Sequence, residues 1–299
     1  MAACATVPAS PLEAHWSIAG EPLVLRSEPR FAGAINSLRY RGVEYINASD
    51  HGRLLQGAIS FEAEGECLNP TQAGASSDGR RSTSRLEAAS ADPSAYATVT
   101  RMAYWLRPGQ ACTRPNGQRR PAVNRARLSD VTYAQRLTPG WRGRANALHH
   151  AITVTTAVPR QYAVVEALTA YTPPGFSAVL LYDARRDRLE PDPHARAHPG
   201  EQGRPVVLAT PDGRSALAFF SPDPKGRYGR FLFSGASKIN VVFRPPNTYA
   251  PGPHAYEVVT VVGTADEVKA TLRALSPAPS PTLGARLRSL WAEFRARLG

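Results

Sequence analysis

The chain has little lysine, little cysteine and no long apolar run, and each shortage excludes classes of protein. No stretch of eighteen consecutive apolar residues occurs, so no segment is predicted to cross a bilayer as a helix. The three cysteines show no Cys-x-x-Cys spacing, which removes the usual support for a zinc or redox centre. No Gly-rich phosphate loop leads from a strand into a helix, and Gly-x-Ser-x-Gly is absent. Nucleotide-dependent enzymes and common serine hydrolases are therefore disfavoured.

Positive charge is abundant, but it is not arranged as in a nucleic-acid-binding protein. The chain has 36 Lys+Arg against 24 Asp+Glu, a net charge of +12, and only three of the basic residues are lysines. Such a balance favours anionic partners such as phosphates, anionic lipid or an acidic polysaccharide. The arginines are scattered singly, and no helix-turn-helix, zinc-finger or RNA-binding signature occurs. We therefore predict no nucleic-acid partner.

The N-terminus resembles the end of a bacterial lipoprotein signal. Small residues lead to Cys4, and a segment rich in Pro, Ala and Ser follows, although the basic and apolar regions of a signal peptide are missing. This pattern predicts an exported, periplasmic or cell-envelope lipoprotein with a membrane tether through Cys4. An ordinary cytosolic N-terminus is the alternative. Lipidation of Cys4 would leave Cys67 and Cys112 either as a disulfide pair or as free buried thiols.

The middle of the chain reads as a long succession of short strands. Pro and Gly clusters separate them, and helical periodicity is almost absent, which is typical of a large antiparallel sandwich. A tight Arg41-Gly42 turn predicts a hairpin within residues 31–47. Strands are expected at 16–25, 54–68, 96–106, 126–137, 148–158, 162–171, 178–183, 206–210, 215–221, 230–234, 239–244 and 256–262.

The last part of the chain changes character. Thr264 and Glu267 form a capping box, and Val268, Leu272 and Leu275 then fall on one helical face. A Pro-rich linker separates this helix from a second one with an apolar stripe and flanking arginines, which either docks on the sandwich or lies on an anionic membrane. We expect an N-terminal tether at 1–15, a β-supersandwich at 16–275, and the linker with a basic amphipathic helix at 276–299.

A row of carboxylates marks the first candidate site. Glu62, Glu64 and Glu66 occupy every second position at the end of the strand expected at 54–68, so they should share one face. Like charges at this spacing face water, pair with cations or are used chemically. A solvated strand face is the alternative. Gln56 points the same way, and Asn69 follows at the start of a long loop, where a carboxylate and an amide can hydrogen-bond sugar hydroxyls.

Other candidates lie elsewhere along the chain. His51 beside Asp50 is suited to proton transfer, or it caps a turn. Arg53 is suited to gripping a uronate carboxylate, or it forms a surface ion pair. Glu166 shares its expected strand face with Val164 and Leu168, so it is either exposed at a cleft or buried with a partner. Aromatic platforms for sugar rings are expected at Tyr104, Trp105 and Tyr171, although aromatic residues in strands more often belong to the core.

The order of elements resembles the β-supersandwich of galactose mutarotase-like proteins. Segments 31–38, 50–56 and 66–74 are similar to uncharacterised secreted bacterial proteins of that type, and the resemblance in layout covers about residues 16–275. In aldose 1-epimerases of this fold a late-strand Glu acts as base, a His as acid, and an Arg with another His holds the sugar. The resemblance implies Glu257 as the base and His51 with Arg53 as the cationic pair. The Asn-His-Pro signature of the epimerases is absent.

These observations predict an all-β protein, a large antiparallel β-supersandwich with short C-terminal helices, that binds a carbohydrate. The binding hypothesis places His51, Arg53, Glu66, Asn69 and Glu166 in one polar cleft. The alternatives are a carbohydrate-active epimerase, lyase or hydrolase that uses His51, Glu66, Glu166 or Glu257, and a structural envelope lipoprotein. We expect no cofactor and no metal, since Asp192, His194 and His198 lie in what reads as a Pro-rich connector.

Overall fold

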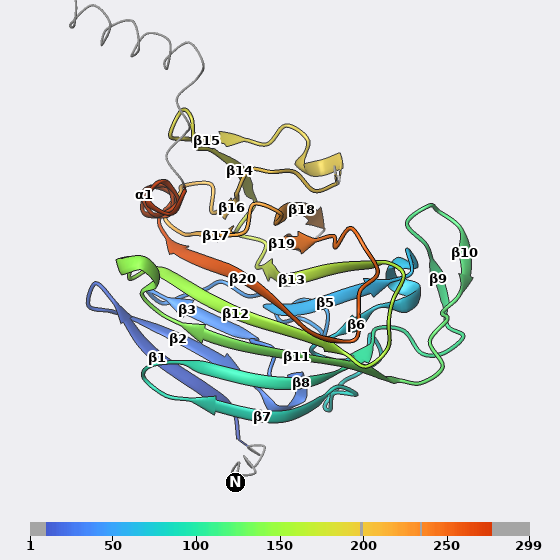
Figure 1. Ribbon diagram of the computed structural model, residues 1–299. Coiled ribbons are helices and arrows are strands. Elements are labelled where there is room, and N and C mark those ends of the chain that lie inside the picture. Colours follow the sequence, from blue (N-terminus) through green and yellow to red (C-terminus); the bar gives the residue numbers. More distant parts are fainter. Residues whose placement is uncertain (1–9, 198–199, 234, 277–299) are drawn as a thin grey trace, which may run out of the picture.

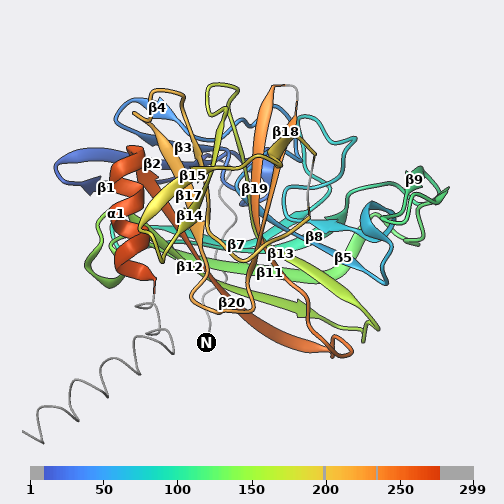
Figure 2. The ribbon, with the colours of Figure 1, turned by 90° about the horizontal axis from the view of Figure 1, so that it is seen from above.

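The computed structural model describes residues 10–197, 200–233 and 235–276. Strands dominate these residues, and one α-helix follows them, so the all-β sandwich expected from the sequence is confirmed. Figure 1 shows the strands stacked in layers, with β1, β2 and β7 at one side and β14–β16 at the other. Figures 1 and 2 both place helix α1 and the β9–β10 hairpin at opposite ends of the molecule.

The structure contains twenty strands among the described residues. The first ten are β1 (Leu12–Ile18), β2 (Glu21–Ser27), β3 (Ser37–Tyr40), β4 (Val43–Glu44), β5 (Gln56–Phe61), β6 (Pro70–Thr71), β7 (Arg85–Ala91), β8 (Tyr96–Tyr104), β9 (Ala111–Thr113) and β10 (Arg119–Pro121). The others are β11 (Leu128–Thr138), β12 (Ala147–Thr156), β13 (Ala163–Thr172), β14 (Ala178–Asp183), β15 (Arg188–Pro191), β16 (Val206–Ala209), β17 (Ala216–Phe220), β18 (Arg227–Phe233), β19 (Ala236–Phe243) and β20 (Gly252–Gly263). Short 3₁₀ turns are η1 (Pro29–Phe31), η2 (Gly65–Leu68), η3 (Trp141–Gly143) and η4 (Ala195–Ala197).

One sheet of fourteen strands makes up most of the molecule. Its order is β15-β14-β16-β17-β20-β12-β11-β8-β6-β5-β13-β19-β18, with β7 paired to β8, and every pairing is antiparallel. Strands β1–β4 form a second sheet, whose strand β1 contacts β7. One large apolar cluster contains buried side chains from both sheets. The core therefore lies between layers of strands, as burial of one face of each sheet requires.

Helix α1 (Ala265–Leu275) closes the described chain as the sequence indicates. The Thr264 side chain accepts a hydrogen bond from the Glu267 amide, and the Glu267 carboxylate accepts one from the Thr264 amide. Val268, Leu272 and Leu275 are buried in a second apolar cluster with side chains of β16, β17 and β20. The expected second helix, most of the Pro-rich linker and Cys4 lie outside the described residues.

Two expectations for the N-terminal part are corrected. The single strand expected at 16–25 is a hairpin, because Ala19 and Gly20 take positive φ angles of 53° and 87° and reverse the chain between β1 and β2. Strand β1 begins at Leu12, inside the segment expected as a tether. The Arg41-Gly42 turn is as predicted, and it joins β3 to β4.

The row of three glutamates on one strand does not exist. Strand β5 ends at Phe61, where Glu62 and Ala63 both take φ angles of 55°, and η2 follows. Glu64 instead pairs with Arg114 at 3.2 Å and Arg120 at 3.0 Å, and Glu62 accepts a hydrogen bond from the Gln161 amide. Period-two reasoning fails here because the backbone leaves the extended region at Glu62, the first residue of the row. Glu66 therefore reaches its position from a 3₁₀ turn.

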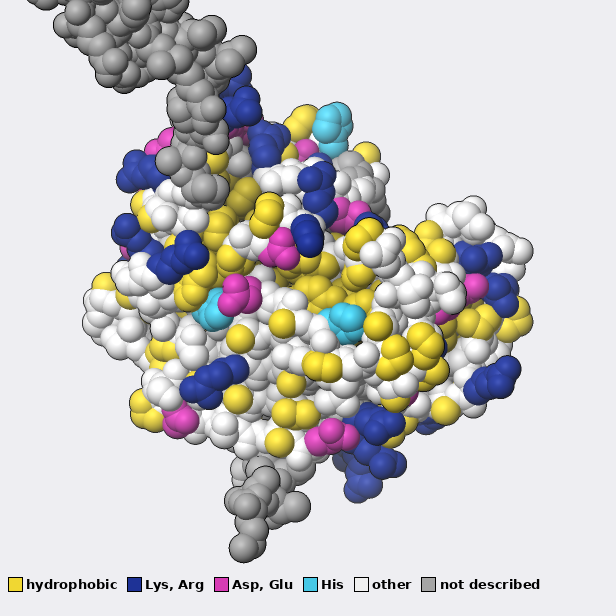
Figure 3. All heavy atoms as spheres, in the orientation of Figure 1, with side chains coloured by type: hydrophobic (Ala, Val, Ile, Leu, Met, Phe, Trp, Pro, Cys, Tyr) yellow, Lys and Arg dark blue, Asp and Glu magenta, His cyan; other side chains and the backbone are white. Residues whose placement is uncertain are grey.

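Cys67 in η2 and Cys112 in β9 form a disulfide, the first of the two states that the sequence allows. The bond attaches the β9–β10 hairpin to the segment that carries Glu66. No helix in the described part of the chain is both long enough and apolar enough to span a membrane. Lys and Arg side chains are scattered over the face drawn in Figure 3 and form no single stripe there.

Candidate functional site

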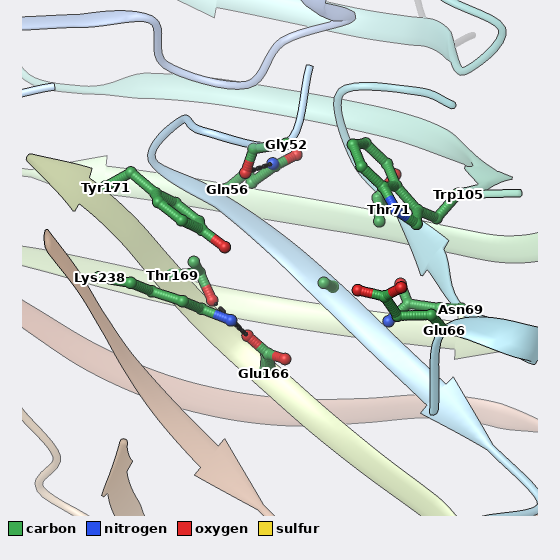
Figure 4. A pocket seen from close by; sticks show the side chains of 11 residues that line it. Gly52, Gln56, Glu66, Asn69, Thr71, Trp105, Glu166, Thr169, Tyr171 and Lys238 are labelled. Atoms are coloured by element: carbon green, nitrogen blue, oxygen red, sulfur yellow. Dashed lines mark hydrogen bonds and ion pairs between the residues drawn. The ribbon is translucent and has the colours of Figure 1, made fainter. Parts of the chain in front are cut away.

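A polar pocket opens on the face of the sheet formed by β6, β5, β13 and β19. Its volume is about 150 Å³, and side chains from six separate segments line it (Figure 4). Six residues that the sequence predicts for a site line it: Gln56, Glu66, Asn69, Trp105, Glu166 and Tyr171. Tyr104, by contrast, is buried in the core. The lining residues are Gly52, Gln56, Ala58, Glu66, Asn69, Thr71, Trp105, Glu166, Thr169, Tyr171 and Lys238.

A β-bulge in β13 decides which side chains of that strand reach the pocket. Glu166 lies opposite Ala58 and Thr169 opposite Gln56, so three steps on β13 match two on β5. The extra residue turns the side chains of all later β13 residues to the opposite face of the sheet. Thr169 and Tyr171 therefore share the pocket face with Glu166, whereas Leu168 is fully buried in the core. The expectation that Glu166 shares a face with Leu168 is wrong for this reason.

Two distant residues support the bulge. The Tyr133 hydroxyl, in the core, donates a 2.8 Å hydrogen bond to the carbonyl oxygen of Ala167, the extra residue. Gly57 makes room for the Tyr133 ring, because a Cβ at position 57 would lie 2.2 Å from Tyr133 Cε2. Burial raises the pKa of Tyr133, so the hydroxyl stays protonated and remains a donor. The side-chain arrangement in the pocket thus depends on a hydrogen bond beneath it.

Glu166 and Lys238 form an ion pair at one wall. Lys238 Nζ lies 2.9 Å from Glu166 Oε2, and their side chains are only 14% and 23% exposed. Thr169 and Asn240 also donate hydrogen bonds to Oε2, at 2.7 and 2.8 Å. Within the described residues no hydrogen bond to Glu166 Oε1 is found, and Figure 4 shows this oxygen pointing away from Lys238. One carboxylate oxygen is thus held in place and the other is available to a ligand.

The pKa values of this pair follow from burial opposed by mutual attraction. Burial alone would raise the pKa of Glu166, but the Lys238 ammonium and the hydrogen bonds from Asn240, Lys238 and Thr169 lower it below its ordinary value. Burial alone would lower the pKa of Lys238, but Glu166 and the Tyr171 hydroxyl raise it. Both groups are therefore charged at neutral pH. Glu166 is consequently a poor proton donor there.

Glu66 and Asn69 lie side by side on the opposite wall (Figure 4). Glu66 is exposed, and no hydrogen bond or ion pair to its carboxylate is found among the described residues. Asn69 Oδ1 is buried and has no hydrogen-bond partner in that part of the chain. An unsatisfied buried acceptor in a polar pocket is costly unless a ligand or water donates to it. This wall therefore offers acceptors for hydroxyl groups.

Two aromatic rings flank the charged groups. The Trp105 indole lies directly over Gly52, since a Cβ on Gly52 would be 2.7 Å from Trp105 Cη2. The Tyr171 hydroxyl points into the pocket (Figure 4), and Lys238 Nζ lies 5.6 Å from the Tyr171 ring centroid. Tyr171 also stacks on Phe233, whose ring is 40% exposed, at 6.1 Å. Half-exposed rings beside hydrogen-bonding groups suit the apolar face of a sugar.

His51 and Gln56 support the pocket from below. The Gln56 amide donates to the carbonyl oxygens of His51 and Gly52, each at 3.0 Å, and accepts from the Ala73 amide. The His51 ring is 3% exposed and does not line the pocket. Its two nitrogens lie 2.7 Å from the Ala73 carbonyl oxygen and 2.9 Å from that of Gly79. Both nitrogens face acceptors, so neither is placed for proton transfer to a bound sugar.

Two further predicted residues lie outside the lining. Arg53 pairs with Asp50. Glu257 lies on β20, more than half exposed, with its carboxylate 3.2 Å from His149 Nε2 of β12. The structure thus does not bring Glu257 together with Glu66 or Glu166 in the pocket.

Lys238 is the principal pocket residue that sequence reasoning missed. It precedes the strand expected at 239–244, where no pattern singled it out. Its rarity was the available signal, because it is one of three lysines, Lys225, Lys238 and Lys269, in an arginine-rich chain. Thr71 and Thr169 were missed as well, since an isolated threonine in a strand has no distinguishing feature.

Comparison with known proteins shows similarity in fold but not in sequence. The chain matches no protein-family model and no curated protein. Its structural neighbours include a candidate aldose 1-epimerase from Escherichia coli K12. That structure is 11% identical and covers 85% of this chain and 100% of its own, with a TM-score of 0.47.

An α-mannosidase from Enterococcus faecalis V583 is 12% identical and gives a TM-score of 0.50. A glycosyl hydrolase family 38 protein from Enterococcus faecalis gives the same identity and TM-score. The similarity covers 84% of this chain but only 30% and 31% of those proteins. At these identities the likeness concerns the fold alone.

Proposed function

We propose that this protein binds a carbohydrate in the pocket between Glu166 and Glu66. The observation that supports this most directly is the composition of the pocket: ionised and amide oxygens with free acceptor capacity, beside half-exposed aromatic rings. Sugar hydroxyls donate to such oxygens, and the C–H face of a sugar packs on rings. An apolar ligand would leave Asn69 Oδ1 without a hydrogen-bond donor.

The size of the pocket favours a single sugar unit. Its volume of about 150 Å³ is below the roughly 300–1,000 Å³ of pockets that enclose whole drug-sized ligands. The protein would therefore hold the terminal unit of a glycan, with the rest of the chain leaving over Trp105 or Tyr171. Glu166 Oε1 and Asn69 Oδ1 would each accept a hydroxyl hydrogen bond.

Calorimetric titration with a panel of neutral, uronate and sulfated oligosaccharides tests this proposal. Trp105→Ala and Asn69→Ala should each weaken binding by about tenfold, the value of one stacked ring or one satisfied buried polar group. Trp141→Ala is the matched control, because Trp141 stacks on His149 away from the pocket. No heat with any saccharide, or equal losses in all three variants, would contradict the proposal.

Catalysis in the same pocket is the second candidate, and one observation favours it. Glu66 and Glu166 face each other across the pocket, and the ionised Glu166 is suited to act as base or nucleophile. Incubation with oligosaccharides would then give new reducing ends, unsaturated products or faster anomer exchange. Activity retained in both Glu66→Gln and Glu166→Gln would contradict this role.

We further propose export, with a membrane tether through Cys4. The Cys67–Cys112 disulfide supports an oxidising compartment, since such bonds are rare in reducing cytosol. Cell fractionation of wild type and Cys4→Ser tests the tether, which predicts release of the variant from membranes. A purely structural envelope role predicts instead that no saccharide binds in the titrations. It also predicts that membrane association depends on residues 282–299.

A further inference from the structure

A second concavity lies beside the pocket and is lined by arginine. We call it the arginine hollow: it is formed by residues 77–83 together with Arg107 and Arg127, and it has a volume of about 440 Å³. Four arginines line it, Arg80, Arg81, Arg107 and Arg127, and all four residues are exposed. Asp78 is the one acidic residue among them.

Among the described residues the Asp78 carboxylate forms an ion pair with one of these four arginines, Arg127. The Asp78 side chain is only 5% exposed, and Oδ2 accepts hydrogen bonds from the amides of Ala75 and Thr83. Oδ1 accepts from the Thr83 hydroxyl and from Arg127 at 3.2 Å. Within the described residues, no hydrogen bond or ion pair to the guanidinium groups of Arg80 and Arg81 is found. The hollow therefore keeps uncompensated positive charge facing solvent.

The loop that carries these arginines is held from beneath. His51 contacts the carbonyl oxygens of Ala73 and Gly79, and the Ser82 hydroxyl donates to the Ala73 carbonyl at 2.8 Å. Arg107 Nε donates to the Ser77 hydroxyl at 3.1 Å. A loop fixed in this way loses little conformational freedom when a ligand binds. His51 thus acts as a positioning residue for the hollow, which accounts for its burial.

The hollow adjoins the pocket through two short connections. Trp105 lines the pocket and Arg107, two residues later, lines the hollow, while the Ser76 amide donates to the Trp105 carbonyl at 2.8 Å. His51, which holds Gly79 of the hollow, is followed by Gly52 of the pocket. The same short segment of backbone therefore carries Trp105 of the pocket and Arg107 of the hollow.

We propose that the arginine hollow binds an oxyanion substituent, a sulfate or a carboxylate, of a glycan whose terminal unit occupies the pocket. This inference rests on the proposed carbohydrate-binding function and specifies its ligand as an anionic glycan. Guanidinium groups bind such oxyanions through paired hydrogen bonds, and exposed unpaired arginines are available for them. The hollow is a single compact cluster beside a sugar-sized pocket, which suits a glycan better than the extended phosphate backbone of a nucleic acid.

Inorganic sulfate tests the hollow independently of any glycan. In protein labelled with ¹⁵N-arginine, sulfate should shift the Nε signals of Arg80, Arg81 and Arg107 with half-saturation at about tenfold lower concentration than those of Arg185 and Arg214. The last two arginines are exposed elsewhere and serve as controls. An equal response of all five signals would overturn the proposal.

Matched oligosaccharides test the link to the pocket. A κ-carrageenan tetrasaccharide should bind about tenfold more tightly than its desulfated form. Tetragalacturonate tests whether a carboxylate can take the place of the sulfate. Arg80→Ser/Arg81→Ser should remove that preference and leave the desulfated form unaffected. Arg185→Ser/Arg214→Ser changes the net charge equally and should keep the preference.

The outcomes separate the two proposals. Loss of binding to all forms in Trp105→Ala, with sulfate shifts intact, supports both the pocket and the hollow. Saccharide binding with no preference for the sulfated form overturns only the proposal for the arginine hollow. Silence with every saccharide, with selective sulfate shifts retained, overturns the carbohydrate function and leaves an anion site. Tight binding of a DNA duplex that Trp105→Ala does not change would identify a different partner and overturn the glycan assignment.

Discussion

In the pocket the Lys238 ammonium lies 2.9 Å from the Glu166 carboxylate. In the neighbouring arginine hollow Arg80 and Arg81 are exposed, and no ion pair to either is found in the described part of the chain. The first arrangement uses charge to fix side-chain geometry, since each ion satisfies the other under partial burial. The second leaves charge available, at little cost because water solvates it. Paired charge should therefore govern stability, and unpaired charge should govern ligand preference.

Breaking the buried pair should have the largest effect. Lys238→Met leaves Glu166 ionised and poorly solvated, so the free energy of unfolding should fall by about 3 kcal/mol in urea titrations. Lys225→Met removes an exposed lysine and should change it by less than about 0.5 kcal/mol. Adding Glu166→Gln to Lys238→Met should recover much of the loss. Equal effects of the two lysine variants would remove the distinction between the regions.

Substitutions at the two residues that support the bulge should have the next largest effect on the free energy of unfolding. Gly57→Ala places a methyl group against the Tyr133 ring, which should lower the free energy of unfolding by about 2 kcal/mol and weaken saccharide binding. Tyr133→Phe removes only the hydroxyl and should cost about 1 kcal/mol. Gly175→Ala, which meets no atom within 4 Å, is the control. Undiminished saccharide binding in Gly57→Ala would show that the bulge is not needed.

The pH dependence of stability should differ between the two regions. The folded-state pKa of Glu166 is below its unfolded value, so its contribution is present above the unfolded value and is lost as the pH falls through the folded one. Wild type should therefore lose more stability than Glu166→Gln between about pH 5 and pH 3, in urea titrations at each pH. Parallel curves for the two proteins would contradict this. Arg80→Ser should follow wild type throughout, because arginine does not titrate there.

The smallest effect is expected in the hollow. Arg80→Ser/Arg81→Ser should change the free energy of unfolding by less than about 0.5 kcal/mol, because exposed unpaired side chains contribute little. Thermal unfolding beside Arg185→Ser/Arg214→Ser measures this difference. A loss comparable to that of Lys238→Met would mean that these arginines are structural, and the comparison would fail.

Much of the fold follows from local patterns. The Arg41-Gly42 turn, the capping box at Thr264 and the alternation of β8, β11 and β12 are properties of neighbouring residues, and all appear as expected. The hairpin of β1 and β2 was missed because its turn is marked only by Ala19 and Gly20, a weak signal. Strand β7 was missed because it is an edge strand with no continuous apolar face.

The site was predicted in composition but less well in geometry. The pocket does bring together Glu66, Asn69, Trp105, Tyr171 and Glu166. Each could be proposed from the sequence because it is a polar or aromatic residue close to a strand end or on a half-buried face. His51 and Glu257 have suitable chemistry but lie elsewhere. Side-chain type indicates what a residue can do, whereas only packing decides which groups face it.

The sequence by itself determined the all-β architecture, the helix at 265–275 and the polar character of segment 50–72, since these depend on periodicity and on contacts a few residues apart. Only the tertiary structure decided that Tyr133 supports the bulge, that Lys238 pairs with Glu166 and that both His51 nitrogens face carbonyl groups. The two residues in each of these contacts lie 22 to 72 positions apart in the sequence. No local pattern encodes them, because they arise when distant parts of the backbone pack together.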